Sequence, residues 1–285
     1  MRKVIHFLIT ATALALAVYF IKDYIFSPSL ATNNIALLMS LTILIHFLKF
    51  LRLYTLFLEE HLKITSVLKI YLKTTFISIS FPFKTGEIYK AYTYGYALEN
   101  YPKGLVALLI ERFFDVLVLC LVLVPACFFF GDENLSIMVY LMGIFVISII
   151  IVCLFFEKTY TYLNRRLIVR GSNAAKNIRA LKATEKIHDI YKSAKNMIEG
   201  RQLVVGLLSI GAWAAEIFLL IVVGGTLKRT VNVVEVGKYV SDGFFGTEND
   251  LYIQYMSASM IVLAIGTLVS LSLSFHKLVQ ERRKK

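Results

Sequence analysis

The chain has 285 residues, of which 58% are hydrophobic and 18% are charged, and its formal net charge is +12. Soluble domains hold about 45–50% apolar residues even when glycine is counted, so this composition excludes a soluble enzyme with a polar surface. At about 20 residues per bilayer crossing, the length allows about six to eight spans but no separate soluble catalytic domain. We therefore expect an all-α, polytopic integral membrane protein with a single transmembrane domain over residues 1–285.

Six apolar runs predict helices that cross the membrane. Their expected bounds are 4–21, 35–51, 105–130, 135–156, 203–227 and 251–275. The first run is too long for the apolar core of a signal peptide, which favours an uncleaved first span. Cys120, Cys127 and Cys153 lie inside these runs without the spacing of metal ligands. They indicate buried thiols and no disulfide framework.

Basic residues between the runs set the expected orientation. Segment 157–201 holds eleven Lys or Arg against four acids, whereas 131–134 has only acids and 228–250 has three bases against four acids. Because cytoplasmic loops are rich in Lys and Arg, we expect segment 157–201 and both termini to be cytoplasmic in a protein of the cell (inner) membrane. We interpret the basic segment as a surface stretch attracted to anionic lipid rather than as a nucleic-acid site.

The connection between the second and third runs is expected to begin and end on one side of the membrane. Two crossings from a cytoplasmic N-terminus return the chain to the cytoplasm near Lys49 and Arg52. The run 105–130 must also start in the cytoplasm, because it ends at the acidic residues 131–134. A single crossing between these two points is therefore excluded by this orientation.

Segment 64–83 lies in that connection and is mostly apolar. Irregular backbone at membrane depth survives only where it packs in protein or lines a wet cavity. We therefore expect a re-entrant or interfacial segment at 64–83, within a re-entrant region 64–90 beside a cavity. In the alternative, 64–83 crosses and another run does not. Lys69 and Lys73, one helical turn apart on one face, make a lipid-facing crossing costly.

Ionisable residues within a membrane are functional candidates by default, and a first group of them lies in segment 81–90. Gly86 is expected to let the backbone turn there, while Lys84, Glu87 and Lys90 carry charge. The alternative interpretation is a cytoplasmic turn whose charges are solvated.

A second group is Glu111, Arg112 and Asp115, about two turns inside the third apolar run. Helical spacing places these residues on neighbouring faces. Their net negative charge predicts a further basic partner, Lys84 or Lys90. Mutual neutralisation of Arg112 and Asp115 is the alternative.

A third candidate is Glu216, near the middle of the run 203–227, with Trp213 one turn before it. A carboxyl group at mid-membrane is protonated, paired or in contact with water. A proton- or cation-linked role and a simple packing contact between helices both stay open, and the sequence names no partner for Glu216.

Several motifs of soluble catalysis do not occur in the sequence. It has no Gly-x-x-x-x-Gly-Lys-Ser/Thr phosphate loop, no His-Glu-x-x-His and no Gly-x-Ser-x-Gly, and its five histidines are scattered. We expect no ATP hydrolysis, no metal and no cofactor.

Two segments in order resemble a known family. They are Phe-Pro-Phe-Lys-Thr-Gly-Glu-Ile-Tyr-Lys-Ala at 81–91 and Glu-Arg-Phe-Phe-Asp at 111–115. They look like the Pro-x-x-x-Gly-Glu-x-x-(Arg/Lys)-Ala and Glu-Arg-x-x-Asp signatures of the lysylphosphatidylglycerol synthase transmembrane (flippase-like) family. Arg52, Trp213 and Glu216 are also similar to that family. The segment 243–248 resembles, in degenerate form, its later Gly-x-Gly-x-x-Glu motif.

The resemblance covers about residues 1–275 and implies a polytopic domain that moves or handles lipids. In the fused synthases this domain is linked to translocation of aminoacylated phospholipid, and a separate soluble domain makes that lipid. We expect here a stand-alone member without the synthase domain, and therefore no aminoacyl transferase.

A flippase needs a charged, wet groove for the head group while the tails stay in lipid. The residues expected to form such a head-group site are Lys69, Lys73, Lys84, Gly86, Glu87, Lys90, Glu111, Arg112, Asp115, Glu216, Gly246 and Glu248. The bases would hold a phosphate, with Arg suited to bidentate contact, and the acids would orient the bases or meet an amine or a sugar hydroxyl. Gly246 and Glu248 would form a matching re-entrant tip from the outer side, as in an inverted repeat.

These expectations favour a lipid translocator or lipid-binding transporter for a phospholipid or a lipid-linked head group. Its partners would be membrane lipids, either anionic phospholipids or prenyl-phosphate-linked species, and an oligomer stays open. The alternative is a non-catalytic membrane partner or scaffold for a glycosyltransferase or lipid-modifying enzyme, in which segment 157–201 matters more than the intramembrane charges. A membrane-embedded transferase with Glu87 as its catalytic carboxylate is a third interpretation.

Overall fold

The computed structural model describes residues 2–25, 35–81, 85–130, 133–169, 174–245 and 250–283. Within these ranges the chain folds into helices with no β-strand, which confirms the all-α fold class. The elements are α1 (Arg2–Ile25), α2 (Ile35–Leu56), the short 3-10 helix η2 (Leu58–Glu60), α3 (Ile64–Ser80), α4 (Thr85–Ala97), α5 (Tyr101–Phe130), α6 (Glu133–Val169), α7 (Ala174–Ile198), α8 (Gln202–Thr226), α9 (Val233–Phe245) and α10 (Asp250–Arg283).

Among the described residues, four helices are long and apolar enough to cross a membrane. They are Ile35–Leu56, Ser136–Val169, Gln202–Thr226 and Asp250–Ser270, and they correspond to four of the six expected spans. The expected spans at 4–21 and 105–130 are also helical, as α1 and α5, but they are not among these four. The number of crossings therefore stays a prediction.

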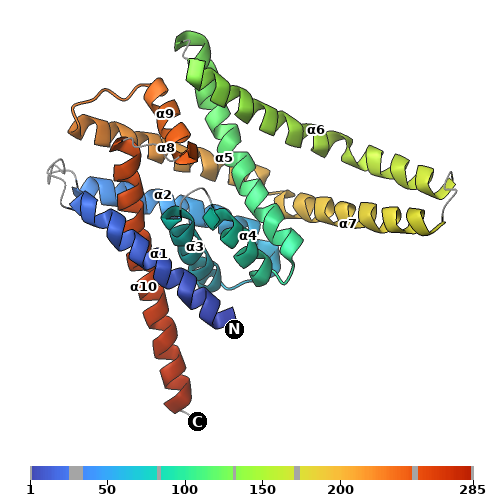
Figure 1. Ribbon diagram of the computed structural model, residues 1–285, viewed down its shortest axis with the longest axis horizontal. Coiled ribbons are helices and arrows are strands. Elements are labelled where there is room, and N and C mark those ends of the chain that lie inside the picture. Colours follow the sequence, from blue (N-terminus) through green and yellow to red (C-terminus); the bar gives the residue numbers. More distant parts are fainter. Residues whose placement is uncertain are drawn as a thin grey trace.

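Two apolar cores fill the helix bundle, in which α2 and α8 run side by side (Figure 1). The first core draws on α1 to α5, α7, α8 and α10, and the second on α2, α5, α6, α8, α9 and α10. Along α2 the buried residues of the second core end at Ile45, and those of the first begin at Phe50. Along α5 the first core ends at Phe114 and the second begins at Val118. His46 and Lys49 on α2, Asp115 on α5 and Ser209 on α8 lie between the residues of the two cores.

Three connections meet at one end of the bundle. Lys103, in the first turn of α5, forms an ion pair with Glu60 at the end of η2. Arg201, just before α8, forms another with Glu59, at 2.8 Å between Nη2 and Oε1. The chain therefore leaves α2, enters α5 and enters α8 at the same end.

Helices α3 and α4 form a short pair between η2 and α5. They have 17 and 13 residues, which correspond to lengths of about 26 and about 20 Å, less than the hydrocarbon core of about 30 Å. Helix α4 packs closely on α5 where Gly95 meets Gly104. A Cβ on Gly104 would overlap the backbone of Gly95, so this close approach requires glycine at position 104.

Helix α6 is longer than the expected span 135–156. It continues to Val169, and α7 then returns beside it, so that the basic segment 157–201 is largely two packed helices. The extension has a simple cause, because no glycine or proline occurs between Glu157 and Gly171 to end the helix. In Figure 1 the end of α6 and the start of α7 lead away from the other helices.

The cysteines depart from the sequence prediction of buried thiols. Cys120 and Cys127 are half-buried and Cys153 is exposed, and all three thiols are free. Cys120 and Cys127 pack against the edge of the second core, whereas Cys153 lies on an exposed face of α6.

Candidate functional site

Arg52 of α2 contacts two other helices between the two cores. Its Nη1 donates to Oδ1 of Asp115 at 2.5 Å and its Nη2 to Oδ2 at 3.2 Å, so the guanidinium binds both oxygens of a carboxylate on α5. Nη1 also donates to the hydroxyl of Ser209 on α8, at 2.9 Å. Arg52 is 3% exposed and Asp115 is 8% exposed. The contact is therefore a buried, bidentate and charge-assisted pair.

The two sequence motifs meet where Arg112 contacts Glu87. Arg112 donates to Oε1 of Glu87 through Nη2 and to Oε2 through Nε, the latter at 3.1 Å. The hydroxyl of Ser78 donates to Oε1 of the same carboxylate at 3.0 Å. Nη1 of Arg112 also lies 3.6 Å from Oδ2 of Asp115. Glu87, Arg112, Asp115 and Arg52 therefore form one row of alternating charge.

Burial increases from Arg112 to Arg52 along this row. The side chains of Glu87 and Arg112 are 19% and 42% exposed, whereas the Arg52 side chain is 4% exposed. The row thus runs from the surface of the bundle into its interior.

Gly86 determines how closely the start of α4 approaches α3. A Cβ at this position would overlap the Cα of Ser78 and lie 2.9 Å from the carbonyl oxygen of Ile77. The sequence predicted a backbone turn at Gly86, but the structure places it in the first turn of α4, where its lack of a side chain permits the close contact. This contact brings Glu87 within reach of Ser78.

A second ion pair joins α4 and α5 beside the row. Nζ of Lys90 lies 2.7 Å from Oε2 of Glu111, and both residues are buried. The hydroxyl of Tyr94 also donates to Oε2 of Glu111, at 3.4 Å. Nζ of Lys90 lies 5.5 Å from the centre of the Tyr94 ring, within cation–π range.

A third polar cluster surrounds Glu216 on α8. Lys49 of α2 donates from Nζ to Oε2 at 2.7 Å, and the hydroxyl of Tyr239 on α9 donates to Oε1 at 2.6 Å. The same ammonium donates to the hydroxyl of Tyr255 on α10 at 3.4 Å. It lies 5.9 Å from the ring centre of Trp213 and also from that of Tyr255. Glu216 is therefore paired with a base and bound by a hydroxyl.

Three buried nitrogens along α2 and α8 have no hydrogen-bond partner among the described residues. They are Nε2 of His46, Nε of Arg52 and Nε1 of Trp213. The other ring nitrogen of His46, Nδ1, lies 3.0 Å from the hydroxyl of Tyr71. Buried polar groups normally have a partner. Water or the oxygen of an anion would satisfy the N–H groups of Arg52 and Trp213.

The structure brings some of the predicted site residues together and separates others. Glu87, Lys90, Glu111, Arg112 and Asp115 form one connected group with Gly86 at its edge, and Glu216 lies in the neighbouring cluster around Lys49. Lys73 of α3 is apart from this group, with Nζ 5.9 Å from the ring centre of Tyr89. Lys69 is on α3 one turn before Lys73. Lys84, Gly246 and Glu248 lie outside the described residues.

Two basic residues that hold the site together were not among the site residues predicted from the sequence. Lys49 and Arg52 were noted only as markers of the cytoplasmic end of a span and as a point of similarity. With His46 they occur at every third position in a helix that has no other charged residue. That spacing puts all three on one face, and it was the available signal for a polar contact with α8.

A family model described as the lysylphosphatidylglycerol synthase TM region matches residues 4–272. The chain belongs to this family. This result confirms the resemblance inferred from the segments 81–91 and 111–115. No curated protein and no solved structure matches the chain.

Membership of the lysylphosphatidylglycerol synthase TM family indicates a membrane protein with a lipid-related function. In this member the two signature segments are joined directly, because Glu87 of the first binds Arg112 of the second. The signature residues of this chain therefore mark a contact between α4 and α5.

Proposed function

We propose that this protein binds the phosphate-bearing head group of a membrane lipid at its row of alternating charges and carries the lipid across the bilayer. The row of Glu87, Arg112, Asp115 and Arg52 is the observation that carries the proposal. Charged side chains within a membrane are costly and commonly mark substrate pathways. Apolar residues of similar volume often replace a buried ion pair without loss of stability, so the pairs favour a role beyond folding.

Arg112, the most exposed member of the row, is suited to receive a phosphate. Arg112 contacts two carboxylates, Glu87 and Asp115, and its side chain is 42% exposed. A guanidinium binds phosphate in the same bidentate manner as carboxylate. A lipid phosphate that replaced Glu87 on Arg112 would leave the Glu87 carboxylate with the hydrogen bond from Ser78, while the acyl tails stayed outside the bundle.

The unpartnered nitrogens support a continuation of this path towards the interior. Nε of Arg52 and Nε1 of Trp213 are donors on α2 and α8, and Lys49 contributes an ammonium between these helices. A phosphate that moved inward along the α2–α8 contact would meet donors in succession. Such a sequence of weak sites permits both entry and release.

The α3–α4 pair is proposed to be re-entrant, which would place this path beside a cavity. Each helix is shorter than a span, and the ion pair of Glu60 with Lys103 brings the two ends of the α3–α4 region together. Both observations favour a segment that enters the membrane and returns to the side from which it started.

Lipid mass spectrometry of the purified full chain tests the binding step. We expect one phospholipid or prenyl-phosphate class to be enriched over its share in the source membrane, and the enrichment to be lost in Glu87→Gln and Arg112→Gln. Arg229→Gln is the matched control, because it removes the same charge from an exposed pair with Asp250. Bulk lipid composition in all samples would contradict the proposal and favour a scaffold for another lipid enzyme. The enriched lipid, carrying a fluorescent tail, then serves in a vesicle translocation assay of the same variants.

A further inference from the structure

A second lipid contact is suggested by the part of α6 and α7 that leaves the bundle. We call residues 157–169 and 174–199 the α6–α7 arm. Its two helices are antiparallel and bound to each other along their length. The ring centres of Tyr160 and His188 lie 4.1 Å apart, and those of Phe156 and Tyr191 lie 4.4 Å apart. The arm is therefore a packed unit and not a loose loop.

The outer surface of the arm combines apolar and basic side chains. Ile168, Val169 and Ile178, near the far end of the arm, are all more than half exposed, and Val169 is 73% exposed. Arg165, Arg166, Arg179 and Lys182 are exposed beside them. This combination is costly in water, because apolar surface stays hydrated, and also in hydrocarbon, because bases are desolvated.

The boundary between head groups and acyl chains satisfies both kinds of side chain. Apolar side chains enter the acyl region there, and Lys and Arg contact anionic head groups. The sequence has eleven bases against four acids in segment 157–201, so the attraction is to an anionic leaflet in particular.

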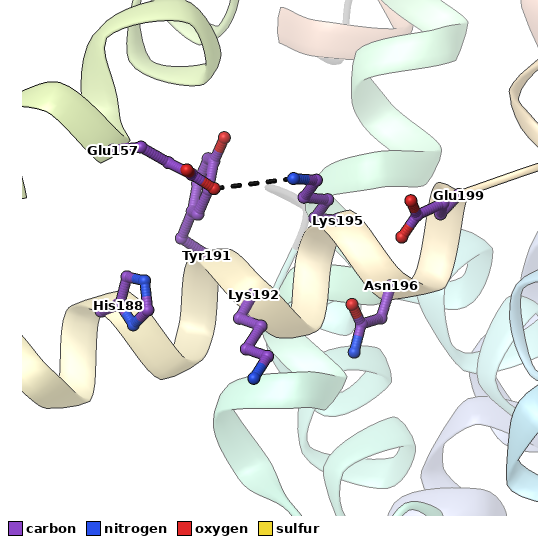
Figure 2. A pocket seen from close by; sticks show the side chains of 7 residues that line it. All are labelled: Glu157, His188, Tyr191, Lys192, Lys195, Asn196 and Glu199. Atoms are coloured by element: carbon purple, nitrogen blue, oxygen red, sulfur yellow. Dashed lines mark ion pairs between the residues drawn. The ribbon is translucent and has the colours of Figure 1, made fainter.

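A polar hollow lies at the base of the arm. It measures ≈ 260 Å³, and its lining includes two bases and two acids; the seven residues are Glu157, His188, Tyr191, Lys192, Lys195, Asn196 and Glu199. Figure 2 shows the side chains of Glu157 and Lys195 directed toward each other across it, at 3.6 Å. Both side chains are more than half exposed, so this pair is weak and a phosphate can take the place of Glu157. The apolar run of α6 ends at Phe156, which puts the hollow at head-group depth.

We propose that the α6–α7 arm docks on the anionic phospholipid of the leaflet in which α6 ends, with its tip in the interface and a head group in the basal hollow. This docking is independent of the row of charges at Arg112. The position of α6 and α7 therefore depends on the anionic lipid content of the membrane.

Spin labelling of the full chain in vesicles tests the docking. Ile178→Cys is placed in a chain with Cys120, Cys127 and Cys153 changed to Ser, spin-labelled, and reconstituted in phosphatidylcholine alone or with about one third phosphatidylglycerol. In the anionic vesicles we expect a several-fold fall in collisions with a water-soluble nickel complex and a rise in collisions with oxygen. About 1 M salt, at which the Debye length is about 3 Å, is expected to reverse the change.

Charge-reversal variants separate docking on lipid from other causes. Arg165→Glu with Lys182→Glu is expected to abolish the response to phosphatidylglycerol. The matched control, Lys63→Glu with Lys228→Glu, makes the same change in net charge at exposed residues outside the arm and is expected to keep it. Equal nickel accessibility in both kinds of vesicle overturns the proposal. A label that the nickel complex cannot reach in either kind of vesicle would indicate a protein partner or a second copy on the arm. That result also overturns the proposal.

Discussion

Arg52 and Asp115 bind each other through two parallel hydrogen bonds, although they are 63 positions apart in the chain and lie on different helices. Arg52 also donates to Ser209. One guanidinium therefore joins α2, α5 and α8 at the boundary between the two apolar cores.

Substitution of Asp115 by Asn is expected to destabilise the protein strongly. Arg52 would stay charged and buried without its counter-charge, and breaking a buried ion pair in this way costs about 3–5 kcal/mol. The double variant Arg52→Met with Asp115→Leu is expected to regain most of this loss, because no unpaired charge remains. Thermal unfolding in detergent, followed by far-ultraviolet circular dichroism, measures both. A double variant that melts below the single variant would contradict this explanation.

Glu216→Gln is expected to have a smaller effect than Asp115→Asn. The Lys49 side chain is 21% exposed, so its ammonium keeps some contact with solvent, and glutamine still accepts the hydrogen bond from Tyr239. A loss of about 1.5–3 kcal/mol, typical of a hydrogen bond to a charged group, is expected in the same assay. Tyr239→Phe removes the other contact of Glu216 and serves as a comparison. A loss for Glu216→Gln that exceeds the loss for Asp115→Asn would show that Lys49 is more enclosed than its exposure indicates.

The sequence predicted the components of the site better than their pairing. Charge in an apolar run identified Glu111, Arg112 and Asp115. The deficit of positive charge predicted Lys84 or Lys90 as a partner, and Lys90 pairs with Glu111. Arg112 also contacts Asp115, as in the alternative interpretation. Arg52 as the partner of Asp115 was not predicted, because the packing of α2 against α5 depends on the whole bundle. For the same reason the sequence did not identify Lys49 as the partner of Glu216.

Helix positions followed from hydropathy, whereas helix ends did not. The expected span 203–227 agrees with α8 to within one residue at each end. The helix that contains the expected span 135–156 continues to Val169, because no glycine or proline occurs between Glu157 and Gly171 to end it. Hydropathy indicates where a helix leaves the lipid. Glycine, proline and capping groups indicate where the helix ends.

Gly104→Ala is expected to separate α4 from α5. The added Cβ would overlap the N and Cα atoms of Gly95, and overpacking of this kind costs about 1–3 kcal/mol. Gly143→Ala in α6 is the matched control, since a Cβ there meets no atom within 4 Å. It is expected to be neutral or to stabilise by about 0.5–1 kcal/mol through helix propensity. Equal melting temperatures for the two variants would show that the α4–α5 contact has room for a methyl group.

The side of the membrane on which each connection lies can be measured with single cysteines in a chain that lacks the three natural ones. Because α8 is apolar enough to cross, Lys192→Cys and Thr230→Cys are expected to react with an impermeant maleimide from opposite sides. The ion pairs of Glu60 with Lys103 and of Glu59 with Arg201 hold the starts of α3, α5 and α8 together. Lys63→Cys and Asn100→Cys are therefore expected to react from the same side as Lys192→Cys, which is the cytoplasmic side by the distribution of basic residues. If the cysteines at positions 63 and 100 react from opposite sides, the α3–α4 region crosses the membrane and the re-entrant arrangement is wrong.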